Sequence, residues 1–327
     1  MSAVVLVTGG AGFIGSHVSK ALAESGFTPV CYDTLEKGHE WAVRWGPLEH
    51  GDIGDAARLE EVFARHKPRA IVHMAGYIEV GESVRQSARY LHNNATKSEV
   101  LIAAAVRQGV DAFVFSSSCA VYGMPQTEQL DETHRIAPLN PYADSKARVE
   151  VRLTRAASEG LRAASLRYFN AAGADVGGEI GEAHEPETHL LPRAVDAMLG
   201  LGPSLTLLGA DYPTPDGFCV RDFIHVSDLA DAHVRALHWL QRTPTPGLHE
   251  QFNLGSGSGY SVRQVVTETA RIAGLPVPYQ VGGRRPGDSP RLVGNIEKSQ
   301  RELGWLPRRD LDLQIEDTLR WRRNMPR

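Results

Sequence analysis

A tyrosine and a lysine four positions apart are the side chains of this sequence best suited to take a proton from an alcohol. Tyr142 and Lys146 follow Asn140 and Pro141, of which the first can cap a helix and the second fits the first helical position. The predicted helix places Tyr142 and Lys146 on one face. Ser118 follows an apolar run, where an open α/β sheet carries its reactive groups.

Hydride removal from an alcohol needs a base for the hydroxyl proton, and a free tyrosine has a pKa near ~10. Lowering that pKa to about 7 requires roughly 4 kcal/mol. One cation ~4–5 Å away, at an effective dielectric constant of ~20, supplies about this much. Lys146 and an oxidised nicotinamide are two such cations, and we expect Ser118 to hydrogen-bond the same substrate oxygen. The Y-x-x-x-K spacing alone occurs in many helices, so it needs a cofactor motif beside it.

A glycine-rich segment near the N-terminus has the form of such a motif. Gly9, Gly12 and Gly15 follow an apolar run and open a helical pattern that includes Phe13 and Ile14. Glycines at this spacing let the chain turn tightly and approach a pyrophosphate, and the helix N-terminus attracts phosphate. The motif alone fits an unliganded turn equally well, but the strand before it and the helix after it favour a dinucleotide site.

Asp33 ends the second apolar run and is predicted to select the cofactor. A carboxylate there accepts hydrogen bonds from the adenosine ribose and repels a 2′-phosphate, which favours NAD over NADP. Asp52 and Ile53 follow the next strand, where an adenine would lie.

These side chains require a frame of strands alternating with helices. Unalternated apolar runs predict strands buried on both faces, at Val4–Val7, Pro29–Tyr32, Ala70–His73, Ala112–Ser116 and Ala163–Tyr168. Helical patterns lie between or after them, at Phe13–Ser25, Leu59–His66, Tyr90–Gln108 and Tyr142–Ser158. The alternation predicts an α/β fold with a doubly wound, Rossmann-like parallel sheet.

A smaller C-terminal α/β domain is expected to bind the substrate, because glycine, proline and aspartate become frequent from about Gly173. We place the NAD-binding domain at residues 1–170 and the substrate domain at 171–218 and 242–327. Residues 219–241 rejoin the first domain, with a strand over Cys219–His225 and a helix over Ser227–Leu240. A further helix, Ser261–Ala273, begins with a capping-box pair, Ser261 and Gln264.

Composition restricts the classes of partner. The 327 residues carry 35 basic and 39 acidic side chains, a net charge of -4, which gives no reason to expect nucleic acid. The chain shows neither a membrane span nor a signal peptide. Its 3 cysteines fit free thiols in the cytoplasm. The histidines show no metal-binding spacing, and we expect His184 and His189 to pack or hydrogen-bond rather than ligate a metal.

Taken together, these motifs resemble the UDP-glucose 4-epimerase family over nearly the whole chain. The segments shared with the wider superfamily include Val7–His17, His73–Gly76, Val80–Ser83, Asn93-Asn94, Phe115–Ser118, Val121–Gly123, Pro141–Lys146 and Leu166–Asn170. More specific to the 4-epimerases are Asp211–Thr214 and Val220–Val226, joined by Asp228–Ala230 and Arg284–Asp288.

The resemblance implies the remaining site residues. Those implied to lie at the NAD cofactor are Phe13, Ile14, Ala75, Gly76, Asn94, Ser116, Tyr142, Lys146 and Tyr168. Those implied to hold a UDP-sugar are Ser118, Tyr142, Asn170, His189, Leu190, Arg221, Arg285 and Asp288. Arginine suits the diphosphate because its planar fork donates two hydrogen bonds, and Asp288 is implied to bind the ribose. The activity implied is inversion of the 4-hydroxyl of UDP-glucose or UDP-galactose through a 4-keto intermediate.

Three positions depart from the pattern of well-known members and leave other UDP-sugars open. Ile78 replaces a lysine near the nicotinamide ribose, and His189 replaces an asparagine beside the diphosphate. Leu292 stands where residue size affects admission of an N-acetyl group. UDP-N-acetylhexosamines and UDP-pentoses are therefore alternative substrates.

Other activities on the same fold are weighed against this interpretation. A 4,6-dehydratase carries Asp-Glu before Val-Tyr-Gly, where this chain has Cys119-Ala120. A UDP-sugar dehydrogenase shares the first half-reaction, and a non-catalytic NAD-binding protein usually lacks the tyrosine or the lysine. Apolar residues on the helices Tyr90–Gln108 and Tyr142–Ser158, including Ala103–Ala105, Val149 and Val151, predict a homodimer.

Overall fold

The computed structural model describes residues 3–243, 245, 247–285 and 288–326, and its centre is a seven-stranded parallel sheet. The strand order is β11-β6-β5-β4-β1-β2-β3. Its strands are β1 (Val4–Thr8), β2 (Thr28–Asp33), β3 (Leu48–His50), β4 (Ala70–His73), β5 (Ala112–Ser118), β6 (Arg162–Tyr168) and β11 (His249–Leu254). The order reverses between β1 and β4, which confirms the doubly wound α/β fold and creates the crevice where such sheets bind ligands.

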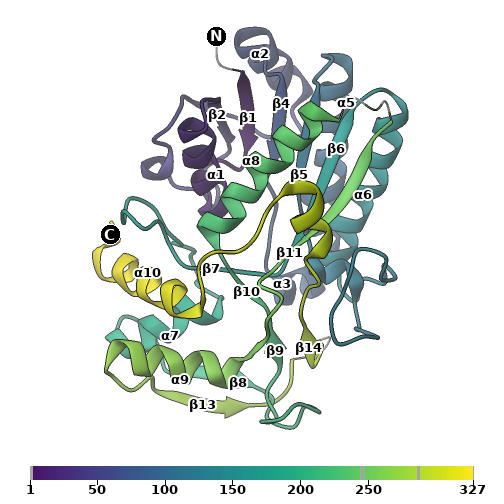
Figure 1. The fold of residues 1–327 in the computed structure, drawn as a ribbon. Helices are drawn as coiled ribbons and strands as arrows, with labels where there is room; N and C mark the ends of the chain where they lie inside the picture. Colours follow the sequence, from purple (N-terminus) through teal and green to yellow (C-terminus); the bar gives the residue numbers. More distant parts are fainter. Residues whose placement is uncertain (1–2, 244, 246, 286–287, 327) are drawn as a thin grey trace.

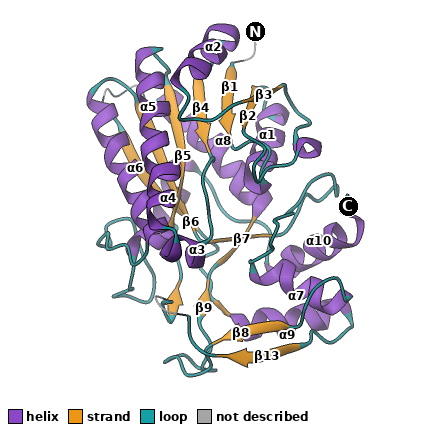
Figure 2. Cartoon of the chain, turned by 180° about the vertical axis from the view of Figure 1, so that it is seen from behind, coloured by secondary structure: helices purple, strands orange, loops and turns teal. Residues whose placement is uncertain are grey.

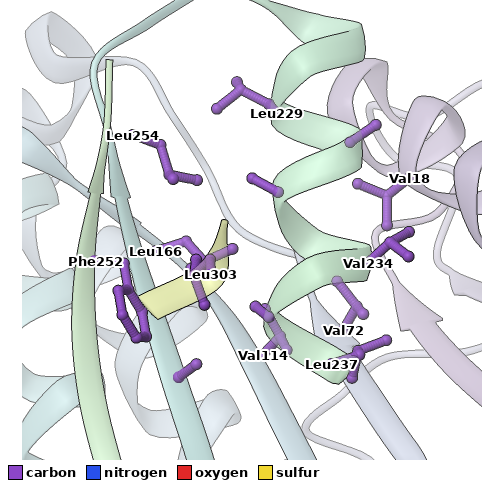
Figure 3. Packing of buried hydrophobic residues seen from close by; sticks show 14 of the residues in the cluster. Val18, Val72, Val114, Leu166, Leu229, Val234, Leu237, Phe252, Leu254 and Leu303 are labelled. Carbon is purple, nitrogen blue, oxygen red and sulfur yellow. The ribbon is translucent and has the colours of Figure 1, made fainter. Parts of the chain in front are cut away.

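Helices cover both faces of this sheet (Figures 1 and 2). One face carries α1 (Phe13–Glu24) and α8 (Val226–Arg242), and the other carries α2 (Ala56–His66), α5 (Lys97–Arg107) and α6 (Pro141–Ser158). Leu229, Val234 and Leu237 of α8 pack toward Val72 and Val114 of the sheet (Figure 3). Burial on both faces explains why the strand sequences are continuously apolar.

The C-terminal half forms a second, smaller layer below the carboxyl edge of the sheet (Figure 1). Its short strands pair as β7 (Asn170–Ala172) with β10 (Phe223–His225), β9 (Val220–Arg221) with β12 (Tyr260–Ser261) and β14 (Arg291–Leu292), and β8 (Leu205–Leu208) with β13 (Tyr279–Gly282). The helices of this layer are α7 (Leu190–Leu199), α9 (Val262–Ala273) and α10 (Leu311–Asn324). The predicted capping box of Ser261 and Gln264 is confirmed.

Two segments lie differently from the prediction. The expected strand Cys219–His225 divides into β9 and β10, which join small sheets rather than the large one. The strand that extends the large sheet beside β6 is β11. It lies within residues 242–327, which the sequence assigned to the substrate domain. Only α8 returns to the sheet as predicted. Asp222 lies between the two short strands, and its carboxylate accepts hydrogen bonds from loop N–H groups.

The predicted helix Tyr90–Gln108 is also interrupted. Its place is taken by α4 (Ser87–Leu91), a π-helical turn over His92–Thr96 and α5, and the short α3 (Val80–Arg85) precedes them. A π turn adds a residue to the helical repeat, and the spacing of apolar residues in the sequence does not predict it.

In the described part of the chain, no helix is long and apolar enough to cross a membrane.

Candidate active site

A cleft of about 420 Å³ runs along the carboxyl edge of the large sheet and faces the smaller C-terminal layer. With the exception of Asn94, every site residue predicted from the sequence lines it. These residues are Gly9, Gly12, Phe13, Ile14, Gly15, Asp33, Asp52, Ile53, Ala75, Gly76, Ser116, Ser118, Tyr142, Lys146, Tyr168, Asn170, His189, Leu190, Arg221, Arg285 and Asp288. Motifs far apart in the chain thus meet in one cavity.

Two glycines of the loop between β1 and α1 have no room for a side chain. Gly9 has a φ of +72°, and a Cβ there would lie 2.6 Å from the backbone nitrogen of Ala75. A Cβ at Gly15 would collide with the carbonyl oxygen of Gly9. The N-cap of α1 is Gly12, and no described side chain caps the helix. The loop therefore offers the helix N-terminus to the cleft, in the arrangement that binds phosphate.

Asp33 lies at the end of β2 and also fixes the glycine loop. Its Oδ2 accepts a hydrogen bond from the backbone N–H of Ala11 at 3.0 Å, and its Oδ1 accepts one from Leu35 at 2.9 Å. Asp52 accepts from the Lys97 ammonium at 2.5 Å and from the Gly54 N–H at 2.8 Å. Both carboxylates line the cleft in defined positions.

Tyr142 and Lys146 come from the first two turns of α6, which begins after Asn140. The Asn140 side chain accepts a hydrogen bond from the N–H of Ala143 at 2.9 Å, so the predicted cap is confirmed. The Lys146 ammonium lies 5.8 Å from the centre of the Tyr142 ring and donates to the carbonyl oxygen of Ser116 at 2.7 Å. Ser118, at the end of β5, lies near enough to Tyr142 to lower its pKa.

Burial controls the pKa of both Tyr142 and Lys146 in the chain without a cofactor. Burial raises the pKa of Tyr142 to about 12, although the side chain of Ser118 opposes the rise. Burial also lowers the pKa of Lys146 to about 8. This raised pKa belongs to the chain without a cofactor, whereas the prediction of a pKa near neutrality concerns the protein with both Lys146 and an oxidised nicotinamide beside Tyr142. A further cation in the cleft has to stabilise the phenolate.

Two neighbours complete the reacting end of the cleft. The hydroxyl of Tyr168, at the end of β6, is in hydrogen-bond contact with the Ser116 hydroxyl. Asn94 is 3 % exposed and lies behind the cleft wall. Its side-chain amide donates to the carbonyl oxygen of Tyr77 at 2.8 Å and accepts from the Tyr77 N–H at 2.8 Å. Asn94 therefore holds the loop that follows Gly76 and does not itself line the cavity.

Positive charge gathers at the other end of the cleft. Arg221 is 8 % exposed and donates to Asp288 Oδ1 at 3.4 Å. Arg285 donates to both carboxylate oxygens of Asp288, at 2.7 and 3.1 Å. Arg284, by contrast, faces away from the cleft and pairs with Asp211 at 2.6 Å. Two of the three arginines are thus placed to receive an anion.

Arg221 owes its position to the next residue, Asp222. This buried carboxylate accepts hydrogen bonds from the backbone N–H groups of Ser256, Gly257 and Gly294, at 2.7, 3.1 and 3.2 Å. Burial raises the pKa of Asp222 to about 6. Asp222 thus ties two segments, Ser256-Gly257 and the one at Gly294, to the end of the strand that carries Arg221.

Sequence reasoning missed several residues of the cleft wall. Glu182 and His184 lie beside His189, and the loop Tyr77–Glu79 and the residues Glu36 and Lys37 form the rim. None of these residues lies in a helix or strand whose sequence pattern could have predicted its place in the cleft. Ile78, Leu292 and Cys119 also line the cavity, so the positions at which the sequence departs from the pattern do face the ligand space.

The amino-acid sequence of this chain is similar to those of proteins with known activities. Residues 5–255 match the model of the NAD dependent epimerase/dehydratase family. A UDP-glucose 4-epimerase from Rhizobium leguminosarum bv. trifolii is 50% identical over 318 residues, which cover 97% of this chain and 96% of the relative.

Solved structures match this chain over nearly their whole length. The UDP-glucose 4-epimerase of Brucella ovis in complex with NAD has a TM-score of 0.93 at 45% identity and covers 97% of this chain and 98% of its own. The enzyme of Bifidobacterium longum, in complex with NAD+ and UDP, has a TM-score of 0.93 at 34% identity, with 99% of both chains covered.

Proposed function

Because the chain belongs to the NAD dependent epimerase/dehydratase family, we propose that it interconverts UDP-glucose and UDP-galactose by inverting the sugar 4-hydroxyl with bound NAD. The observation that carries this proposal is the single cleft that contains both Tyr142 with Lys146 and the pair Arg221 with Arg285. Relatives named UDP-glucose 4-epimerase, at up to 50% identity over nearly the whole chain, support it.

The cleft fits NAD in shape and in charge. The glycines at positions 9 and 15 let the loop pack against neighbouring backbone where no side chain would fit, and the N-terminus of α1 suits the pyrophosphate. Asp33 would accept the ribose hydroxyls, and Asp52 with Ile53 would border the adenine. The nicotinamide would lie toward Tyr142, Lys146 and Tyr168. When bound there, NAD supplies a hydride acceptor and a positive charge.

We assign the proton transfers to Tyr142. As phenolate it takes the proton of the sugar 4-hydroxyl while the C4 hydrogen leaves as hydride, so a 4-keto sugar forms. The phenol then returns the proton to the oxygen when hydride arrives on the opposite face of C4. Ser118 hydrogen-bonds the same oxygen and orients it. Lys146 and the cofactor charge stabilise the phenolate against the cost of burial.

We assign the anchoring of the substrate to the diphosphate end of the cleft. Arg221 and Arg285 would bind the phosphates with charge-assisted hydrogen bonds, Asp288 would accept from the ribose, and Asn170 and Leu190 would border the nucleotide. The hexose end offers mainly Ser118 and Tyr142, so the sugar can turn while the nucleotide stays in place. This division is what epimerisation requires of a 4-keto intermediate.

The proposal is tested by a panel of UDP-sugars given to the purified protein without added NAD. We expect UDP-galactose and UDP-glucose to be interconverted, and UDP-N-acetylhexosamines and UDP-pentoses to react more slowly. Exclusive turnover of an N-acetylated or pentose substrate would replace the sugar assignment. No turnover of any UDP-sugar by NAD-loaded protein would refute the enzyme assignment.

Cofactor choice gives a separate prediction. Asp33→Ala removes the acceptor for the ribose hydroxyls and for the Ala11 N–H. The protein should therefore retain NAD poorly or lose its preference for NAD over NADP. The measurement is the nucleotide released on denaturation of wild type and variant. Asp111→Ala, an aspartate outside the cleft, is the control. NADP bound to the wild type would contradict the role of Asp33.

We further propose a homodimer formed through α5 and α6. Val151 of α6 is 53% exposed and remains available to a partner, whereas Val149, Ala104 and Ala105 are fully used in the chain's own core. The apolar surface is therefore smaller than the sequence indicated. Sedimentation at micromolar concentration should give twice the mass of the chain, and Val151→Asp should lower it. A monomeric wild type would contradict the proposal.

We also propose that the enzyme acts in the cytoplasm, in galactose metabolism. Cys31, Cys119 and Cys219 are buried free thiols, which fits a reducing compartment. Interconversion of the two UDP-hexoses connects galactose with glucose chemistry.

A further inference from the structure

Four side chains of one loop converge at the wall of the cleft, and the proton and hydride transfers proposed above do not involve them. Glu182, His184, Glu187 and His189 lie in the stretch that precedes α7, and the potential ligand atoms of all four are within 4.8 Å of one another. From the sequence we expect the two histidines to pack or to form hydrogen bonds rather than to ligate a metal, and the family resemblance places His189 at the UDP-sugar.

The separations within this Glu–His cluster (Glu182, His184, Glu187 and His189) suit a small central ion. His184 Nδ1 lies 3.0 Å from Glu182 Oε1 and 3.8 Å from Glu187 Oε1. His189 Nδ1 lies 3.5 Å from Glu187 Oε1 and also contacts Glu182 Oε1. Donors around a tetrahedral zinc ion, bound at 2.0–2.2 Å, stand about 3.3–3.6 Å apart. The observed separations surround this range.

A second observation points to a missing partner. The side chain of Glu187 is only 8% exposed. Its Oε2 is enclosed, and no described group forms a hydrogen bond with it. His189 Nδ1 is also enclosed, and its approach to the carboxylates lacks hydrogen-bond geometry within the described chain. Buried polar atoms normally have partners, and a cation bound by the cluster would supply one to both.

The alternative is a network of imidazolium–carboxylate pairs. In the chain alone, burial opposes the charge of His184 and His189, but the two glutamates raise the pKa of the histidines to about 9 and about 10. Such a network balances charge but leaves the two enclosed atoms without partners. Two neutral imidazoles and two carboxylates around a divalent cation balance the same charge and engage all four side chains.

The donor set selects the kind of cation. Two imidazole nitrogens and two carboxylate oxygens suit zinc and related first-row metals, whereas calcium and magnesium prefer oxygen alone. Outer contacts also fix the ligands, as in established metal sites. Glu187 Oε1 accepts hydrogen bonds from the backbone N–H groups of Thr188 and His189, at 2.8 and 2.9 Å. Four protein ligands describe a closed, structural site.

The loop that carries the Glu–His cluster contacts two other parts of the chain, so a bound cation would stabilise these contacts. The Trp321 indole of α10 donates to the Glu182 carbonyl oxygen at 2.8 Å, and His39 contacts the Ala183 carbonyl oxygen at 2.6 Å. Lys37 donates to the Glu185 carbonyl oxygen at 3.2 Å. The loop thus joins the segment after Asp33 to the C-terminal layer. We propose that Glu182, His184, Glu187 and His189 bind one zinc-type divalent cation, which holds this loop against the cleft.

The test is independent of epimerase activity, so failure of one proposal leaves the other intact. NAD-loaded protein is stripped with a chelator, equilibrated with micromolar Zn²⁺, passed through a desalting column and analysed for metal. We expect one zinc per chain and a rise of several degrees in melting temperature, because a ligand bound only by the native state stabilises it. Co²⁺ in place of Zn²⁺ should give the visible absorption of a tetrahedral complex.

Variants separate this site from casual binding by surface histidines. His184→Ala and the nearly isosteric Glu187→Gln should lose the bound zinc and the thermal shift, and each is checked for fold by circular dichroism. His92→Ala, which removes an exposed histidine that is not part of the Glu–His cluster, should keep both. Failure of the wild type to retain zinc would overturn the proposal, as would zinc retained in full by both cluster variants.

Discussion

Tyr142→Phe should lower kcat by at least ~10²-fold, which is the ordinary cost of losing a general base. The substitution removes one oxygen and little volume, so the fold and NAD binding should persist. The loss should appear in kcat rather than in KM, because the Tyr142 hydroxyl takes part in proton transfer in the transition state and adds little to the binding of the nucleotide. Steady-state kinetics with UDP-galactose measure it.

Tyr279→Phe is the matched control, because it removes the same hydroxyl from β13, outside the cleft. It should keep wild-type kinetics. A Tyr142→Phe protein that turns over at the wild-type rate, with intact NAD binding, would exclude Tyr142 as the base.

Arg221→Ala should raise KM for UDP-galactose by about 10- to 100-fold, as expected when a hydrogen bond to a charged group worth about 1.5–3 kcal/mol is lost. Because the diphosphate is held equally in ground and transition states, kcat should change little. Arg285 still pairs with Asp288 in this variant, so the buried carboxylate keeps a partner and the fold should survive.

Arg284→Ala is the control for this prediction. Arg284 neighbours Arg285 in sequence but pairs with Asp211 and stacks on Tyr212, 4.4 Å from the ring centre, so its loss should leave KM unchanged. Equal effects of the two substitutions would mean that general surface charge, rather than a placed guanidinium, attracts the substrate. An unchanged KM in Arg221→Ala would remove Arg221 from the phosphate site.

The sequence was informative wherever function depends on local chain geometry. A few consecutive residues were enough to predict three such features: the loop at Gly9–Gly15, the capped start of α6 at Asn140 and the strand end at Asp33. The parallel sheet then brings these segments to one edge, because all its strands end on the same side. The side chains predicted for the catalytic step therefore line one cleft, although much of the cleft wall was not predicted.

What the sequence did not provide depends on packing between distant segments. The π-helical turn that positions Asn94, and the pairing of β11 rather than Cys219–His225 with the large sheet, carry no periodic signal. The high pKa of Tyr142 follows from burial, which spacing does not reveal. The convergence of Glu182 and Glu187 on His184 and His189 depends on the folded course of an irregular loop.

The central claim is that the hydride removed from C4 returns to the same sugar. The most direct measurement follows deuterium from UDP-galactose labelled at C4 through conversion by the NAD-loaded protein, with no cofactor added. We predict UDP-glucose that retains the deuterium at C4, with no net absorbance of NADH during steady turnover. Stoichiometric release of NADH and of a 4-keto product, with the label lost from the sugar, would show instead that the chain is a dehydrogenase.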